Sequence, residues 1–292
     1  MKISDPGAEV LQAATQGDLA AIDRLLLAIQ PGVHNLAVRV LGQRDDAADA
    51  TQEILLKVVT HLSGFRGEAA FTTWVWRVAH NHLLTARTRS AESPEVSLEA
   101  MAEKLDTGLD FATHAAQAHG VPGPLTPQDK LEARQVALAC TQSMLMCLDR
   151  DQRLVYLLDT VFDLPSQEAA AVVGISPQAY RQRLSRARQR LHGFMGRTCG
   201  LVAHDAACRC ERQLPAVRQL RGARRVVNIQ PAAQAGATGG AAAATFDAFA
   251  RVSDAASVFR SHPEVQVPEA LRAAIRWVLS REGFLPPGSL PQ

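Results

Sequence analysis

Apolar residues recur at helical spacing along most of the chain, and polar residues fill the positions between them. Thr51, Leu55, Val58 and Leu62 stand at i, i+4, i+7 and i+11, on one face of a helix predicted over residues 45–62. Similar stripes cover residues 8–41 and 129–158. Within the first of these, the Pro31-Gly32 pair predicts a break between two helices. The pattern as a whole predicts an all-α protein.

Residues 164–191 predict two short helices joined by a tight turn. Ser166 can cap the first helix, and Gly174 is the residue type that best tolerates a positive φ at its end. Ser176 and Pro177 then suit the N-cap and the first position of a second helix. The apolar stripe of that second helix consists of Tyr180, Leu184, Ala187 and Leu191. The stretch therefore predicts a helix-turn-helix.

The second of these helices is polar and basic on the face opposite its stripe. Gln178, Gln182 and Ser185 lie there, and they are flanked by Arg181, Arg183, Arg186, Arg188 and Arg190. Such a helix can pack on its partner while it presents hydrogen-bonding side chains and cations to a DNA groove. From this stretch alone, an arginine-rich helix on a solvated surface, with no nucleic acid bound, is the alternative.

The helix predicted over residues 45–62 carries a mixed outer face. Asp46, Asp49, Glu53 and Leu56 point away from the apolar stripe, so an apolar side chain stands among acids. One exposed leucine is ordinary, and carboxylates on a helix are usually just solvated. A protein-docking face and a plain surface are equally compatible with this pattern.

The next stretch, residues 63–89, interleaves aromatic and basic residues. Trp74 falls with Phe71, Val75 and Val78 on the side expected to face the core. The outward side is expected to hold Trp76, Arg77, His80, Leu84 and Arg87. Rings and cations on one face suit unstacked single-stranded bases, which stack on the rings while the cations hold phosphates. The alternative is that both tryptophans serve packing.

Charge and cysteine content narrow the class of protein. The net charge is only +2, but twelve arginines stand against two acids, Asp205 and Glu211, between Arg181 and Arg225. A basic block of this kind is typical of nucleic-acid contact.

No apolar run is long enough to span a membrane, and no signal segment opens the sequence, so we expect a cytoplasmic protein with no membrane partner. Five cysteines, an odd number, argue against a disulfide scaffold.

Three motifs in order carry a family resemblance: DDAADATQEILLKV, then FRGEAAFTTWVWRVAHN, then LSRARQRL after the helix-turn-helix. This order resembles the bacterial sigma factors of the extracytoplasmic-function group, over roughly residues 8–195. The resemblance implies a protein that binds core RNA polymerase and directs it to promoters, without being an enzyme and without a required cofactor. An anti-sigma factor is a further possible partner.

The resemblance also assigns roles to particular residues. It implies that the beta-prime clamp of the polymerase is bound by Asp49, Gln52, Glu53 and Leu56. It implies that the melted minus-ten strand is captured by Phe65, Arg66, Trp74, Arg77, His80, Asn81 and Arg87. It implies that the duplex minus-thirty-five element is read by Gln178, Arg181, Arg183 and Arg186, and we expect Arg188 and Arg190 to contact phosphates there.

The predicted organisation is two small helical domains, a flexible linker and a partly disordered tail. Sigma region 2 is expected over residues 8–89 and sigma region 4 over residues 128–196. The linker, residues 90–127, is rich in proline and glycine and has room for a transient helix at about residues 98–105. Within the tail, residues 197–292, we expect a flexible Ala/Gly-rich arm at 230–245 and a short helix at 268–281. The apolar stripe of that helix is expected to consist of Leu271, Ala274, Ile275, Val278 and Leu279.

The tail also holds a cluster of soft metal ligands: Cys199, His204, Cys208 and Cys210. Thiolates with one imidazole suit Zn²⁺ or Cu(I), although this spacing is not that of a standard zinc finger. The cluster loosely resembles the cysteine-rich tails of a subgroup of these sigma factors in which a metal ion switches activity. Reduced or redox-reactive thiols are the alternative. In either case the tail is a candidate regulatory element.

Two other classes of function compete with the sigma factor. A stand-alone helix-turn-helix regulator, bound as a dimer to operator DNA, would leave the acidic helix and the aromatic-basic stretch unexplained. A metal-dependent enzyme built on the tail cysteines would lack a nearby carboxylate in a context suited to a general base. The sequence therefore favours the sigma factor.

Overall fold

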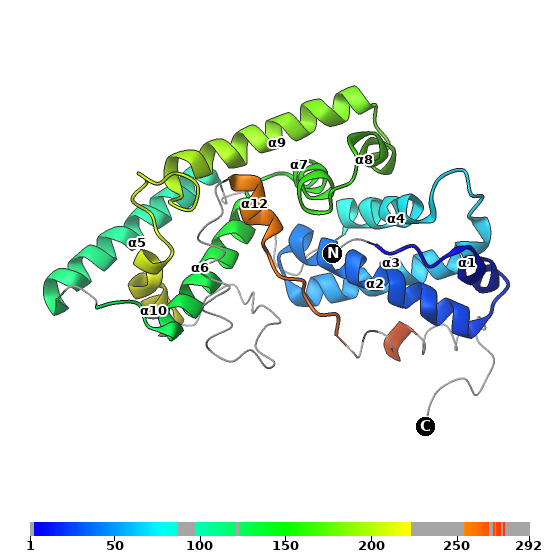
Figure 1. Ribbon diagram of the computed structural model, residues 1–292, viewed down its shortest axis with the longest axis horizontal. Helices are drawn as coiled ribbons and strands as arrows, with labels where there is room; N and C mark the ends of the chain where they lie inside the picture. The colour runs from blue at the N-terminus through cyan, green and yellow to red at the C-terminus, as the bar shows by residue number, and fades with distance from the viewer. Residues whose placement is uncertain are drawn as a thin grey trace. The chain divides into compact units, whose positions relative to one another are not determined.

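The computed structural model describes residues 3–86, 97–120, 123–222, 254–268, 271, 273–275 and 277. Within these ranges the regular elements are helices, and the only β pairing is an isolated bridge between Cys199 and Cys208 (Figure 1). The chain forms two compact units. The first comprises residues 1–89, 157–182 and 264–292, and the second comprises residues 90–156 and 183–263. The predicted all-α class is confirmed.

The first unit is built on a bundle of three long helices. These are α2 (Leu19–Leu41), α3 (Arg44–Thr60) and α4 (Phe71–Thr85), with the shorter α1 (Ala8–Thr15) and η1 (Leu62–Gly64) beside them. The unit also holds η2 (Leu157–Val161), α8 (Ser166–Val173) and the first residues of α9 (Pro177–Thr198). Its core contains the fully buried side chains of Leu25, Ile29, Ile54, Leu55 and Leu83. The predicted inward stripe of α3 is therefore confirmed.

Helix α2 does not break at Pro31, which corrects the expectation of two helices. Pro31 has no N–H, so one hydrogen bond of the helix is missing at this point. Proline usually ends a helix for that reason, but here apolar residues on both sides of it are buried, including Leu25, Ile29 and Leu36. The Pro31 carbonyl accepts a hydrogen bond from Asn35 Nδ2 at 2.9 Å. Burial on both flanks outweighs the local cost of the proline.

The second unit is also helical. It contains α5 (Leu98–His119), α6 (Pro127–Met146), α7 (Arg150–Tyr156), most of α9, η3 (Glu211–Gln213), α10 (Leu214–Gly222) and α12 (Ala255–Arg260). The buried guanidinium of Arg153 donates hydrogen bonds to the carbonyls of Leu145 and Leu148, at 2.9 and 2.8 Å. It thereby supplies donors to carbonyls in the last turn of α6 and in the turn that follows it. Tyr156 packs edge-on against Phe259 of α12, with ring centroids 5.2 Å apart.

Helix α5 is longer than the transient helix expected in the linker. Its 22 residues, Leu98–His119, occupy more than half of the stretch that the sequence marks as a tether. Leu98 and Met101 are buried, and the helix packs against η3 and α10 of the C-terminal extension. The tertiary contacts come from a segment about a hundred residues later, so local composition does not reveal them. Composition therefore underestimates the order of this stretch.

We expect Ser97→Ala to destabilise α5. The Ser97 hydroxyl oxygen accepts a hydrogen bond from the Ala100 backbone N–H at 3.0 Å and so caps the first turn. Removing such a cap costs about 1 kcal/mol, and urea unfolding followed by circular dichroism measures it. The matched control is Ser143→Ala on α6, where the hydroxyl donates to the Ala139 carbonyl within the same helix and caps nothing. Equal effects of the two substitutions would contradict the capping role.

Part of the predicted C-terminal helix lies within the described residues. Leu271, residues 273–275 and Trp277 are helical. Leu271 and Ile275, two residues of the expected apolar stripe, are buried. Val278 and Leu279, which complete that stripe, lie outside the described residues, as does the predicted Ala/Gly-rich arm at 230–245.

Candidate functional site

The outer face of α3 is accessible over residues 49–56 as the sequence predicts, but Asp46, which was also expected on this face, is buried. Asp49 and Glu53 are exposed, and Gln52 and Leu56 are half-buried. The four residues stand at i, i+3, i+4 and i+7, so they share one face of the helix. Thr51, on the other face, is buried. The structure thus groups all four residues predicted to contact the polymerase.

A positive charge borders this acidic face. Lys57 Nζ lies 2.8 Å from His82 Nδ1, and the same imidazole nitrogen lies 3.8 Å from the Glu53 carboxylate. Burial, followed by the nearby Lys57 ammonium, lowers the pKa of His82, while Glu53 acts in the opposite direction. A neutral imidazole therefore connects α3 to α4 at neutral pH.

Phe65 and Trp74 belong to a cluster of three rings. The Phe65 centroid lies 5.5 Å from that of Phe71 and 5.5 Å from that of Trp74, and the latter two are 5.7 Å apart. Phe71 is buried, whereas Phe65 and Trp74 are half-buried, and Arg66 beside them is exposed. The ring of Phe65 thus packs the loop that precedes α4 against that helix, while the side chain of Arg66 lies in solvent. Three of the residues predicted to capture the melted strand are brought together.

The other face of α4 is covered by α8. Trp76 is only 2% exposed and packs on Phe162, with ring centroids 4.9 Å apart. Thr73 Oγ1 donates to Glu168 Oε1 at 2.8 Å. Arg77 donates to the Ala171 carbonyl from Nε at 3.2 Å and from Nη2 at 2.8 Å. Phe162, Glu168 and Ala171 lie 86 to 95 positions after their partners on α4 and carry no local signal, so sequence reasoning missed Phe162 and Glu168.

This packing corrects the predicted orientation of two residues. Trp76 and His80 were expected to face outward, but both are buried. The predicted faces of α4 are therefore wrong in part, because Trp74 and Val78, which were expected on the core side, are only half-buried. The helical period also does not reveal that Phe162, in a distant segment, packs on Trp76.

Of the remaining residues predicted to bind the melted strand, Asn81 is exposed, with Oδ1 3.2 Å from His80 Nδ1. Arg87 lies outside the described residues.

Helices α8 and α9 form the predicted helix-turn-helix. Gly174 follows α8 in the left-handed region, with φ of 75°, and its N–H donates to the Ala170 carbonyl. Ser176 Oγ accepts a hydrogen bond from the Ala179 N–H at 3.2 Å, at the start of α9. The inward stripe is confirmed, because burial is complete or nearly so for Tyr180, Leu184, Ala187 and Leu191.

The five arginines from Arg181 to Arg190 on α9 divide into two groups. Arg181, Arg186 and Arg188 are exposed, as is Gln178. Arg183 is half-buried, and its Nη1 lies 2.8 Å from the Asp151 carboxylate of α7. Arg190 donates to Gln152 Oε1 at 2.9 Å and to the Cys147 carbonyl at 3.1 Å. Arg183 and Arg190 therefore hold the part of α9 in the second unit to other residues of that unit, so Arg190, which was expected to contact phosphates, is bonded within the protein although it is exposed. Arg181, Arg186 and Arg188 remain the candidate surface for DNA.

The tail cysteines gather, but His204 does not join them. Cys199 and Cys208 pair in the isolated bridge, and the Gly200 N–H donates to the Cys208 carbonyl at 2.9 Å. Burial raises the pKa of the Cys199, Cys208 and Cys210 thiols, which favours the neutral form. His204 is exposed. Among the described residues no group of three or more His, Cys, Asp or Glu side chains is arranged to hold a metal ion. Metal binding stays a prediction.

Among the described residues, no helix combines the length and the apolar character that crossing a bilayer requires.

Comparison with known proteins places two family regions on this chain. Residues 25–92 match Sigma-70 region 2, and residues 138–191 match Sigma-70 region 4. The first contains the acidic face of α3 and the whole of α4, and the second contains the helix-turn-helix. The class that these regions define, in this order, is the sigma factor.

The chain is also similar to individual sigma factors and to one solved structure. The RNA polymerase sigma-H factor of Pseudomonas aeruginosa is 28% identical over 185 residues, covering 62% of this chain and 89% of that protein. The ECF RNA polymerase sigma-E factor of Escherichia coli is 28% identical over 184 residues, with the same two coverages. A solved structure of CnrH in complex with the cytosolic domain of CnrY has 22% identity, covers 65% of this chain and 96% of that chain, and gives a TM-score of 0.45.

The two matched regions and the similarity to the sigma-H and sigma-E factors support a sigma factor of the extracytoplasmic-function type. The protein directs the initiation of transcription. The family resemblance inferred from the sequence is thereby confirmed as far as the two sigma regions, and the C-terminal extension lies outside them.

Proposed function

We propose that this sigma factor binds core RNA polymerase through the outer face of α3, with the beta-prime clamp as the partner surface. The observation that carries the proposal is the arrangement of Asp49, Gln52, Glu53 and Leu56 on one accessible face above a buried stripe. An apolar side chain within a rim of acids suits a docking surface, because the apolar group supplies burial and the charges supply specificity.

In the same proposal α9 reads duplex promoter DNA at the minus-thirty-five element. Gln178 and Arg181 lie near the N-terminus of an exposed helix face, where side chains of a helix-turn-helix reach base edges. Arg186 and Arg188 lie farther along that helix and are suited to phosphates. Arg183 contributes less directly, because its guanidinium is paired with Asp151.

The melted minus-ten strand is proposed to bind at Phe65, Arg66 and Trp74, with Arg77, His80 and Asn81 on the adjoining faces of α4. Half-exposed rings beside an exposed cation suit bases and phosphates of a single strand. Arg77 donates its hydrogen bonds to Ala171, and His80 is buried. Full capture of the strand therefore requires α8 to move away from α4 once polymerase holds the protein.

Run-off transcription with purified bacterial core RNA polymerase and a randomised promoter library tests this function. We expect transcripts from a defined subset of promoters that are absent with core enzyme alone. Glu53→Arg should lower their yield by about tenfold or more, because opposing like charges at an interface cost over 1.4 kcal/mol. The control is Glu9→Arg, an exposed acid on α1 outside the proposed surface.

An equal loss in both variants would contradict the role of the α3 face. Absence of promoter-specific transcripts, together with binding to a palindromic operator, would instead support a stand-alone helix-turn-helix regulator.

Several finer assignments are part of the same proposal. The functional divisions are residues 8–89 for region 2, 90–127 for the linker, 128–196 for region 4 and 197–292 for the extension. A protein with this role acts in the cytoplasm, where its polymerase is, and carries out no catalysis of its own. An anti-sigma factor is a proposed further partner. The extension is proposed to regulate activity through metal or the redox state of Cys199, Cys208 and Cys210.

A further inference from the structure

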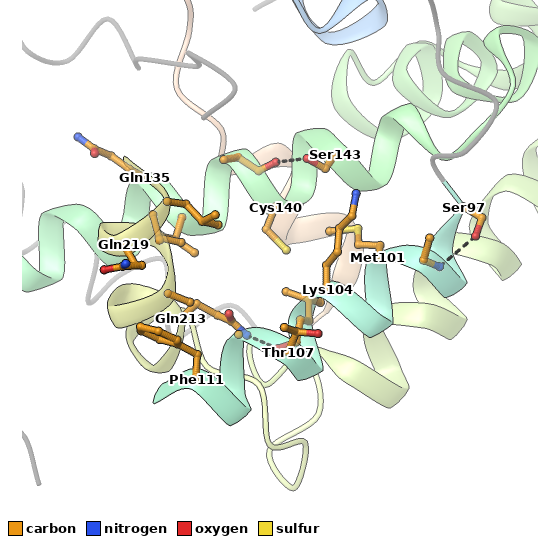
Figure 2. A pocket seen from close by; sticks show the side chains of 18 residues that line it. Ser97, Met101, Lys104, Thr107, Phe111, Gln135, Cys140, Ser143, Gln213 and Gln219 are labelled. Atoms are coloured by element: carbon orange, nitrogen blue, oxygen red, sulfur yellow. Dashed lines mark hydrogen bonds between the residues drawn. The ribbon is translucent and has the colours of Figure 1, made fainter. Parts of the chain in front are cut away.

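Helices α5, α6 and α10 enclose a groove of about 660 Å³ in the second unit (Figure 2). This volume falls within the roughly 300–1,000 Å³ typical of small-molecule sites. Its walls come from three parts of the sequence: the segment between the two sigma regions, the first helix of region 4 and the C-terminal extension. The function derived above uses none of the residues that line it.

The walls are predominantly apolar. The larger apolar side chains that line the groove are Met101, Leu105, Phe111, Val136, Val217 and Leu220. Phe111 is 41% exposed and Leu220 is 57% exposed, although both are large apolar residues. Cys140 adds to this character, because it stays a neutral thiol: burial strongly raises its pKa. Large apolar side chains gathered around a groove and left partly in water favour a ligand with an apolar body.

Most polar groups of the lining are already engaged within the protein. Gln213 Nε2 donates to the Leu105 carbonyl at 2.8 Å. Ser97 Oγ accepts from the Ala100 N–H, and Ser143 Oγ donates to the Ala139 carbonyl at 2.9 Å. These groups hold the walls together and offer little to a ligand.

Lys104 is the one charged side chain of the lining, which contains no Asp or Glu. Figure 2 shows it extending beside Met101 within the groove. Among the described residues Lys104 makes no hydrogen bond or ion pair. A single ammonium beside apolar walls matches one monovalent anion, whereas a phosphate dianion is usually held by several donors or by the fork of an arginine.

We propose that the groove binds an amphipathic carboxylate: a molecule with an apolar chain whose single carboxylate pairs with Lys104. A fatty acid has this chemistry, whether free in solution or as the acid of a lipid surface. Because α10 forms one wall, an occupied groove joins the C-terminal extension to the linker helix and to region 4. The ligand therefore stabilises the docked form of the extension.

Isothermal titration calorimetry and thermal unfolding of the full chain test the proposal. The probes are dodecanoate and dodecanol below their aggregation concentrations, with phosphatidylglycerol vesicles as the membrane arm. We expect dodecanoate to bind and to raise the melting temperature, and dodecanol, which lacks the charge, to bind at least about fivefold more weakly. Binding to vesicles but not to the monomeric acid would overturn the proposal.

Two variants locate the site, and circular dichroism checks that each is folded. Lys104→Met should abolish the preference for the acid over the alcohol while binding of the alcohol persists, because the apolar walls remain. Val136→Trp should fill the groove and weaken both probes. The matched control, Lys130→Met on α6, changes a lysine outside the groove and should leave the preference intact. An unchanged preference in Lys104→Met, or no binding of either probe to the natural sequence, would refute the proposal.

Discussion

Arg181→Ala is expected to lower promoter-specific initiation by about 5- to 150-fold, because a bidentate arginine contact to a base contributes about 1–3 kcal/mol of discrimination. Arg181 is exposed on α9, one residue after the fully buried Tyr180. Its Cα position is therefore fixed by the core, while its guanidinium is free to reach a base edge. Run-off transcription from a randomised promoter library, followed by sequencing of the selected promoters, measures both yield and sequence preference.

A loss of base reading and a loss of charge predict different results. If Arg181 reads a base, the selected promoters should lose their preference at one position of the minus-thirty-five element. If it contacts only phosphate, yield should fall evenly for all promoters and preference should be unchanged. Arg24→Ala, an exposed arginine on α2, removes the same charge away from α9 and should have neither effect. Unchanged preference in Arg181→Ala would contradict base reading.

The parts of the fold that the sequence predicts are those governed by local spacing. The stripe of α9 and the inward face of α3 follow from the helical period, since each places its apolar residues on one side. The turn between α8 and α9 follows from Gly174, whose positive φ few other residues adopt without strain. In these places the local conformational preference and the tertiary packing agree, so the local sequence is sufficient to predict the structure.

Predictions from the sequence are wrong where contacts with distant segments determine the local structure. Pro31 signals a helix end, but burial on both sides keeps α2 continuous. The linker composition signals a flexible tether, but η3 and α10 pack along α5 and extend it to 22 residues. His204 stands between cysteines in the sequence, yet its side chain is exposed while the cysteines are partly buried. In each case contacts across many residues outweigh the local preference.

The candidate sites also fall into two groups: those formed by a single helix and those formed by several segments of the chain. The acidic face of α3 and the exposed face of α9 need only one helix each, so periodicity predicts them. The groove beside Lys104 needs three segments of the chain, and no spacing in the sequence indicates it. The covered face of α4 needs α8 in the same manner. Sites assembled within one element are therefore readable from sequence, whereas sites assembled between elements require the structure.

Trp76→Ala is expected to lower the free energy of unfolding of the full chain by about 3–5 kcal/mol, the usual cost of removing a buried tryptophan side chain. Trp76 is 2% exposed and meets Phe162 edge-on. Urea unfolding measures the loss. Trp277→Ala is the matched control, since that ring is 49% exposed and its removal should change stability by only about 0.5 kcal/mol. A loss below about 1 kcal/mol in Trp76→Ala would contradict its burial.

A double-mutant cycle with Phe162→Leu separates the contact with the second segment from packing within the α2–α4 bundle. If Trp76 and Phe162 stabilise the protein through each other, the two substitutions together should cost about 0.5–1.5 kcal/mol less than the sum of their separate costs. Additive losses would mean that Trp76 serves only the bundle. Coupling would mean that the face of α4 carrying Trp76 and Arg77 is held against the segment around α8 in the free protein, so the proposed strand capture would require this contact to be lost.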